Sequence, residues 1–70
     1  MMRLTVLRED RRWSRSELAR RARMANSDVG KIEARRQVPY PSQLVKLTDA
    51  LGFTGDPTAL LDEVGGHAGD

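Results

Sequence analysis

The sequence of 70 residues contains no cysteine, so it can form neither disulfide bonds nor thiolate metal sites. Its single histidine, His67, lies in a glycine-rich C-terminal stretch, and this leaves no cluster of ligands for a metal ion. No run of apolar residues approaches the roughly 18 needed to cross a membrane, and charged residues after Leu7 interrupt any signal-peptide core. We therefore expect a cytoplasmic protein without a metal, cofactor or membrane partner, stabilised by apolar packing.

The patterns typical of catalysis are also missing from the chain. There is no glycine-rich phosphate loop, no cysteine or histidine paired with a second catalytic group, and no carboxylate cluster on one inner face. The sequence therefore predicts a protein that is not an enzyme.

Charge is distributed unevenly along the chain, although the formal net charge is only +2. Residues 1–38 contain eleven Lys and Arg against five Asp and Glu, whereas residues 39–70 contain one Lys against five Asp and Glu. An anionic partner would bind the basic part. A solvated, arginine-rich helical surface would have the same charge balance, so charge alone does not decide between these two interpretations.

Five helical segments are expected, joined by short breaks. They are predicted at residues 3–12, from Ser14 onward, after Met24 to about Arg35, from Pro41 to the C′ residue Gly52, and from the cap Asp56 through Val64. The apolar positions on their inner faces are Leu4, Leu7, Leu18, Ala19, Ala22, Ala25, Val29, Ile32, Leu44, Leu47, Ala50, Leu51, Leu60, Leu61 and Val64. The predicted fold is an all-α, compact five-helix bundle in one domain, residues 1–64, with a flexible tail at 65–70.

The start of the second segment has a specific signature. Ser14 and Glu17 match a capping box, in which the Ser14 hydroxyl accepts from the Glu17 amide and the Glu17 carboxylate accepts from the Ser14 amide. Trp13 precedes the cap at the position that packs on Leu18 as a hydrophobic staple. These residues are expected to set the direction in which the second helix enters the bundle.

The outward face of the third segment is small and polar. At 100° per residue, Asn26, Ser27, Gly30 and Lys31 lie opposite the stripe that contains Val29. A glycine inside a helix costs about 1 kcal/mol relative to alanine. Something other than folding is therefore expected to favour Gly30.

The chain from Leu7 to Gly52 resembles the Xre/Cro-type helix-turn-helix family, which includes the lambdoid phage repressors. The resemblance rests on motifs at family spacing without insertions, namely Leu7-Arg8-Glu9, Ser14-x-x-Glu17-Leu18-Ala19, Val29-x-x-Ile32-Glu33, Pro39, and Leu44-Val45-Lys46-Leu47-x-x-Ala50-Leu51-Gly52. It implies that the second and third segments form the helix-turn-helix and that the third, about residues 26–35, enters the major groove of DNA.

The resemblance and the chemistry of base edges together suggest the contacts. Asn26 can pair with adenine, Lys31 can donate to guanine, Ser27 can bond several bases, and Gly30 allows close approach. The candidate phosphate contacts are Ser14, Arg15, Ser16, Arg35, Arg36, Gln37, Tyr40, Ser42 and Gln43. For each of these positions, an ordinary solvent-exposed residue is the alternative.

The resemblance also assigns structural roles and shows departures from the family pattern. It implies an ion pair between Arg8 and Glu33. Arg12 and Arg35 stand where glycine commonly ends a helix in the family. Ala25 replaces the usual Ser or Thr cap, so the third helix is expected to begin at Asn26.

The expected function is that of a sequence-specific double-stranded DNA-binding transcriptional regulator, acting as a repressor. Related readers bind as two-fold dimers, so we expect a weak homodimer on an inverted-repeat operator, with Leu61 and Val64 as the dimer surface. Leu60 and Phe53 are expected to complete the monomer core instead. The alternative is an antitoxin or adaptor module on the same fold, whose partner is a toxin or co-regulator protein.

Overall fold

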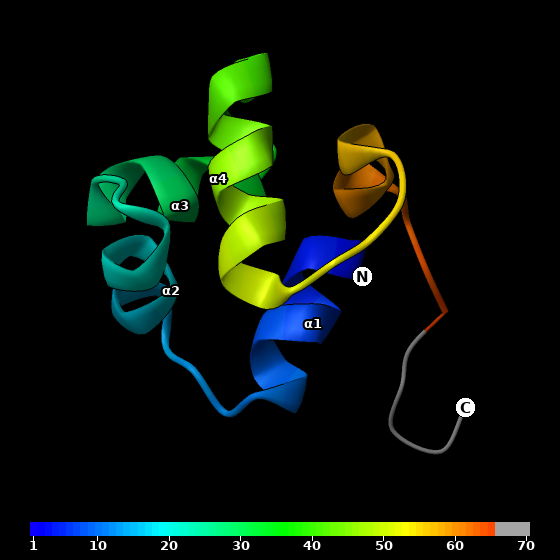
Figure 1. Ribbon diagram of the computed structural model, residues 1–70, viewed down its shortest axis with the longest axis horizontal. Helices are drawn as coiled ribbons and strands as arrows, with labels where there is room; N and C mark the ends of the chain where they lie inside the picture. Colours follow the sequence, from blue (N-terminus) through cyan, green and yellow to red (C-terminus); the bar gives the residue numbers. More distant parts are fainter. Residues whose placement is uncertain (66–70) are drawn as a thin grey trace.

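The computed structural model describes residues 1–65, and its regular elements are helices (Figure 1). They are α1 (Arg3–Asp10), α2 (Arg15–Ala22), α3 (Asn26–Glu33), α4 (Pro41–Leu51) and a 3-10 helix, η1 (Pro57–Leu61). Within these residues the only strand-like pairing is an isolated antiparallel bridge between Met2 and Glu63. The all-α class is confirmed, whereas the count of five helices is corrected to four α-helices and one 3-10 helix. His67 and the rest of the expected tail from residue 66 lie outside the described residues.

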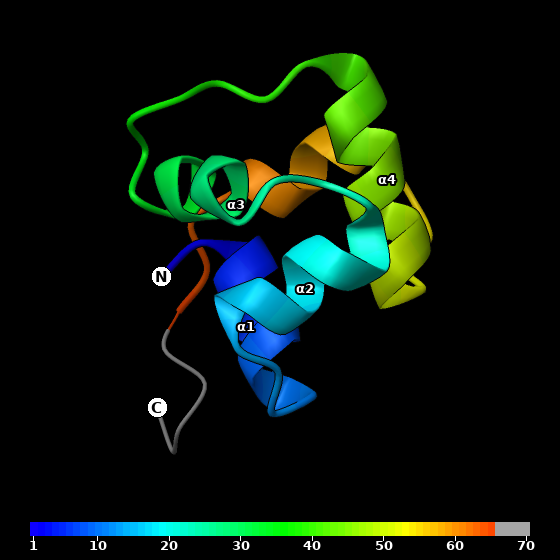
Figure 2. The same cartoon turned by 90° about the vertical axis from the view of Figure 1, so that its left-hand side faces the viewer.

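The helices pack around one apolar core. α2 packs against α3 and α4, while η1 packs against both α1 and α4. Figure 1 shows α2 and α3 on one side of the molecule, and Figure 2 shows the connection from α3 to α4 passing over the top. The buried apolar side chains are Met2, Leu4, Leu18, Ala19, Ala22, Val29, Ile32, Leu44, Leu47, Leu51 and Leu60. No helix in the described part of the chain is long and apolar enough to cross a membrane.

The last segment differs from the predicted fifth helix. Asp56 caps it as expected, because its carboxylate accepts from the Thr58 amide at 3.0 Å. The helix is 3-10 rather than α, and it ends at Leu61. The chain then runs alongside the N-terminal segment, where the Val64 amide donates to the Met1 carbonyl at 2.8 Å. This bond, and the bond from the Arg3 amide to the Asp62 carbonyl, join the two segments side by side. Val64 is therefore not part of a helix, contrary to the prediction.

The first helix also ends earlier than predicted. Asp10 is its last residue, and Arg12 adopts a left-handed conformation with φ 58°. Two further arginines, Arg23 and Arg35, adopt left-handed conformations, with φ of 57° and 59°. For a residue with a Cβ this conformation costs roughly 1–2 kcal/mol. It ends α1 at Asp10 and lets the chain reverse after each of the first three helices.

Half of the predicted capping box is present. The Ser14 hydroxyl accepts from the Glu17 amide at 3.0 Å, as expected. The reciprocal bond was wrongly predicted, because the Glu17 carboxylate instead bonds Arg20 and Arg21 on the same helix. Charged donors bond a carboxylate more strongly than a backbone amide does. Trp13 is partly buried and packs against the core, as expected of a staple.

Helix α3 begins at Asn26, with Ala25 at the N-cap and no side-chain cap bond. Ala25 is exposed, so its predicted place on the inner stripe was wrong. Helix α4 begins at Pro41, and the Gln43 side-chain carbonyl accepts from the Tyr40 amide at 2.9 Å. Gly52 ends α4 in a left-handed conformation, φ 64°, as its C′ position predicts.

Candidate nucleic-acid interface

The C-terminal end of α3 is attached to α1 by a buried ion pair. The Arg8 Nε donates to Glu33 Oε2 at 2.8 Å, and its Nη2 donates to Glu33 Oε1 at 3.1 Å. The remaining Nη1 donates to the Trp13 carbonyl at 2.7 Å. The Glu33 side chain is 1% exposed and the Arg8 side chain 10%. This bidentate arrangement sets the position of α3 relative to α1 and to the chain entering α2.

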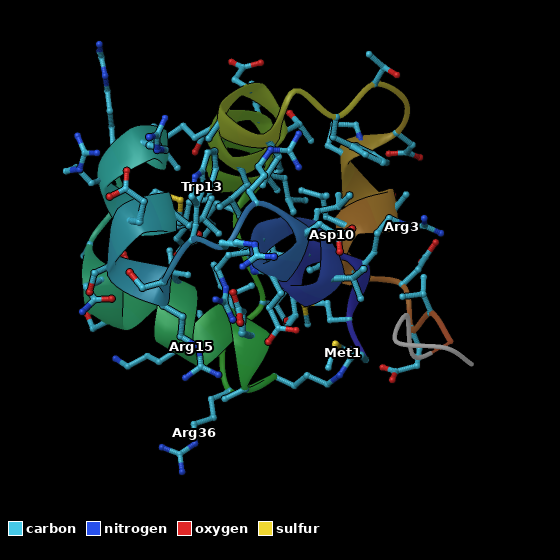
Figure 3. The ribbon with its side chains drawn as sticks, turned by 90° about the horizontal axis from the view of Figure 1, so that it is seen from below. Met1, Arg3, Asp10, Trp13, Arg15 and Arg36 are labelled. Carbon is cyan, nitrogen blue, oxygen red and sulfur yellow. The ribbon has the colours of Figure 1, made fainter. Side chains whose placement is uncertain are left out.

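A second arginine reaches the same carboxylate from α2. The Arg15 Nε lies 3.3 Å from Glu33 Oε1, and the Arg15 side chain is still 55% exposed. Arg15 is therefore held at one point while the rest of its guanidinium faces solvent. In Figure 3, Arg15 and Arg36 project on the same side of the molecule, from the start of α2 and the loop after α3.

The outward face of α3 is open. Asn26, Ser27 and Lys31 are exposed, and the opposite face buries Val29. A Cβ built on Gly30 would meet nothing within 4 Å, so packing within the described chain does not require glycine there. The exposed face of α3 therefore carries polar side chains next to Gly30, which leaves open space because it has no side chain.

In the loop between α3 and α4, one arginine forms an ion pair within the described chain and the next does not. Arg35 bonds the carboxylate of Glu63 at 2.5 Å, so its charge is already partnered. The Arg36 side chain is exposed and has no hydrogen-bond partner within residues 1–65. Gln37 is half-buried, while Tyr40 is 70% exposed.

The hydroxyl and amide candidates also divide into two kinds. Ser16 and Ser42 are exposed at the first turns of α2 and α4. The Ser14 hydroxyl and the Gln43 carbonyl are each used in a helix cap. Ser16 and Ser42 can therefore donate to an incoming anion. Ser14 and Gln43 can donate as well, through the hydroxyl and amide hydrogens that their cap bonds do not use.

The two residues expected at a dimer surface are only partly accessible. Leu61 lines a small hollow of about 100 Å³ together with Met2, Ile32 and Pro39. Val64 is half-buried next to the N-terminal segment. Leu60 is fully buried and Phe53 packs against the core, as expected. The more exposed apolar side chains nearby are Val38, at 85%, and Tyr40.

Sequence reasoning missed several arginine contacts. Arg11 donates to the carbonyls of Leu7 and Leu51, and thereby joins α1 to the end of α4. Arg21 places its guanidinium 4.4 Å from the centre of the Trp13 ring. The spacing from Leu7 to Arg11 is a helical i, i+4 signal, but nothing in the sequence indicates the partner on α4.

Glu63 forms a second unexpected cluster, with the N-terminal ammonium and Arg35. Hydrogen bonds from the N-terminus and Arg35 hold the pKa of Glu63 below its ordinary value. Hydrogen bonds from Arg21 and Arg20 likewise lower the pKa of Glu17. Both carboxylates are therefore charged at neutral pH and neutralise nearby cations.

Comparison with known families supports the architecture described above. A family model described as a helix-turn-helix domain, of the Xre/Cro-like kind, matches residues 2–61. No curated protein and no solved structure shows significant similarity to the chain. The matched range includes α1 through η1. Such a domain indicates a DNA-binding regulator.

Proposed function

This chain belongs to the helix-turn-helix domain family, and from that premise we propose that it is a sequence-specific, double-stranded DNA-binding repressor of transcription. Its recognition element is α3, which enters the major groove with its N-terminal residues against the base edges. One observation carries the proposal. The open polar face of α3, the half-exposed Arg15 and the unpartnered Arg36 belong to adjoining elements, and Arg15 and Arg36 point the same way (Figure 3).

The base contacts come from α3. Asn26 pairs with adenine, Lys31 donates to the acceptors of guanine, and Ser27 bonds a neighbouring base. Gly30 lets the helix approach closely, because its missing side chain leaves open space on this face. Glu33, buried beneath, orients the helix and does not touch DNA.

The phosphate contacts come from groups around α3 that remain available. Arg15, Arg36, Ser16 and Ser42 are the principal ones, since each is exposed. Gln37 and Tyr40 contribute from the loop. Arg35 contributes less, because its guanidinium already bonds Glu63. Ser14 and Gln43 can still donate, because their cap bonds use only acceptor oxygens.

Repression follows from occlusion of a promoter by two copies of this domain on an inverted-repeat operator. A single domain makes few base contacts, and half-sites about one helical turn apart require a two-fold dimer. Leu61 and the neighbouring Val64 belong to the contact between copies in this proposal, and the contact is weak because both are half-buried. The protein acts in the cytoplasm.

The test is selection of bound duplexes from a random-sequence pool, at low and at near-physiological salt. We expect an enriched inverted repeat and an affinity that falls steeply with salt, because bound phosphates release counterions. An absence of enrichment, together with an affinity that does not change with salt, would refute the proposal.

A second candidate function is protein recognition, as an antitoxin or an adaptor for a co-regulator. Two observations favour it. Lys31 is the single charged side chain on the exposed stripe of α3, and Val38 and Tyr40 expose apolar surface on the next loop. The selection experiment separates the two functions, because a protein-recognition module would recover no operator.

A further inference from the structure

A cleft at the C-terminal end of α2 is not used by the proposed base and phosphate contacts. It has a volume of about 300 Å³ and is lined by Arg21, Ala22, Arg23, Lys46 and Asp49. Three cations and one carboxylate make it a positively charged hollow. We propose that this cleft binds a phosphate of the DNA backbone at the edge of the major groove opposite Arg15; the inference rests on the proposed function.

The charges in the cleft are available to a ligand. Within residues 1–65, neither the Arg23 guanidinium nor the Lys46 ammonium forms an ion pair or side-chain hydrogen bond. Arg21 is fixed in place, because its Nε bonds Glu17 at 2.5 Å and its guanidinium lies over Trp13. That bond uses Nε, so the terminal nitrogens of Arg21 remain as donors. One positioned donor and two unpaired cations suit an oxyanion.

Arg23 lies close to the start of α3. Arg23 has φ 57°, a left-handed conformation that glycine adopts without the steric cost of a Cβ. It lies in the turn between α2 and α3, three residues before Asn26 at the start of the recognition helix. The strained position thus places a positive charge close to the end of α3 that faces the bases.

The length of α2 is similar to the width of the major groove. Arg15–Ala22 has eight residues, which corresponds to a helix about 12 Å long, close to the roughly 12 Å width of the major groove. In helix-turn-helix docking, the first helix of the motif crosses the DNA backbone. In this proposal Arg15 and the cleft, at the two ends of α2, contact phosphates on different strands.

The test compares two double variants of the full chain. Arg23→Gly with Lys46→Gln removes the two unpaired cations of the cleft. Arg12→Gly with Arg20→Gln is the matched control, because it removes the same charge, also replaces a left-handed arginine by glycine, and lies outside the cleft. Affinity for the selected duplex is measured by fluorescence anisotropy from 50 to 200 mM salt.

We expect the cleft variant to bind less tightly and its plot of log affinity against log salt to be less steep by about 0.9, the value for one phosphate. Its deficit relative to the wild type should be about threefold larger at 50 mM than at 200 mM salt. The control should keep the wild-type slope. Truncating the duplex on the side contacted by the cleft should abolish the difference between wild type and cleft variant.

Other outcomes overturn the inference and leave the proposed function standing. A cleft variant with the wild-type affinity and salt slope would show that the cleft does not contact DNA. If a polyglutamate peptide then binds the wild type and not the variant, the cleft serves an acidic protein segment instead. If circular dichroism shows that the double variant does not fold, the test uses the single variant Lys46→Gln, because Lys46 is exposed and its replacement should not disturb the fold. A wild-type chain without affinity for DNA would refute both proposals.

Discussion

The two ends of α3 are built in opposite ways. At the C-terminal end, Glu33 is almost fully buried and bonds two arginines from other helices. At the N-terminal end, Asn26 and Ser27 are exposed, and no side chain caps the helix. One end of the same eight-residue helix therefore positions it in the fold, while the other remains open to a partner. The comparison predicts that mutations at the two ends act on different properties.

Removal of the Glu33 charge should have the largest effect. Glu33→Gln leaves Arg8 buried without its counter-charge, and we expect the free energy of unfolding to fall by about 3–5 kcal/mol in urea denaturation. Glu63→Gln, which breaks an exposed ion pair, is the control and should cost much less. Similar losses in the two variants would show that burial of the Glu33 ion pair does not determine its contribution to stability.

Lys31→Ala should affect binding rather than folding. We expect a loss of about 1–3 kcal/mol in affinity for the selected operator and a relaxed preference at one base position. Stability should change by less than about 0.5 kcal/mol, because the side chain is exposed. Binding to an operator series substituted one base pair at a time checks this. An equal loss on every sequence would reassign Lys31 to the DNA backbone.

Arg15→Ala sharpens the same comparison from α2. This arginine should contact phosphate, so its loss should weaken binding to all sequences alike and reduce the salt slope by about one. Its bond to Glu33 is secondary to that of Arg8, and we expect only a modest fall in stability. Salt titrations with specific and random duplexes provide the measurement. A change in base preference would contradict the assignment.

Gly30→Ala should separate stability from function within α3. The added Cβ meets nothing within 4 Å, so the helix should gain about 1 kcal/mol from the better propensity of alanine. If the open space accommodates DNA, the same change should weaken operator binding. Thermal unfolding and anisotropy on one sample test both. A variant that is more stable and binds as well as the wild type would show that the gap is not used.

The smallest expected effect is the pH dependence of the Glu17 cluster. Hydrogen bonds from Arg21 and Arg20 lower the folded-state pKa of Glu17 below its ordinary value of 4.5. Its contribution to stability is therefore present above that value and is lost as pH falls through the lowered folded-state pKa. The stability difference between the wild type and Glu17→Gln should be constant near neutral pH and shrink under acid conditions. A difference that grows in acid would contradict the sign.

Much of the fold could be predicted because its signals are local. Apolar spacing located the four α-helices. Ser14, Pro41 and Gly52 correctly marked ends of α2 and α4, and Asp56 marked the start of the 3-10 helix. Each of these signals acts within one or two turns of the chain, where physical chemistry depends on neighbouring residues. Helix spacing also identified the exposed face of α3, including Gly30.

The tertiary structure decided how the arginines are used. The sequence shows ten of them, but which ones are paired depends on residues distant in the chain, as with Arg35 and Glu63 or Arg11 and Leu51. The same dependence ended the last helix at Leu61, because the N-terminal segment supplies hydrogen bonds that favour extended chain there. Local sequence determines where helices form, since their bonds are local. Only the folded chain determines which charges are neutralised and which remain available, because ion pairs join elements that the sequence leaves far apart.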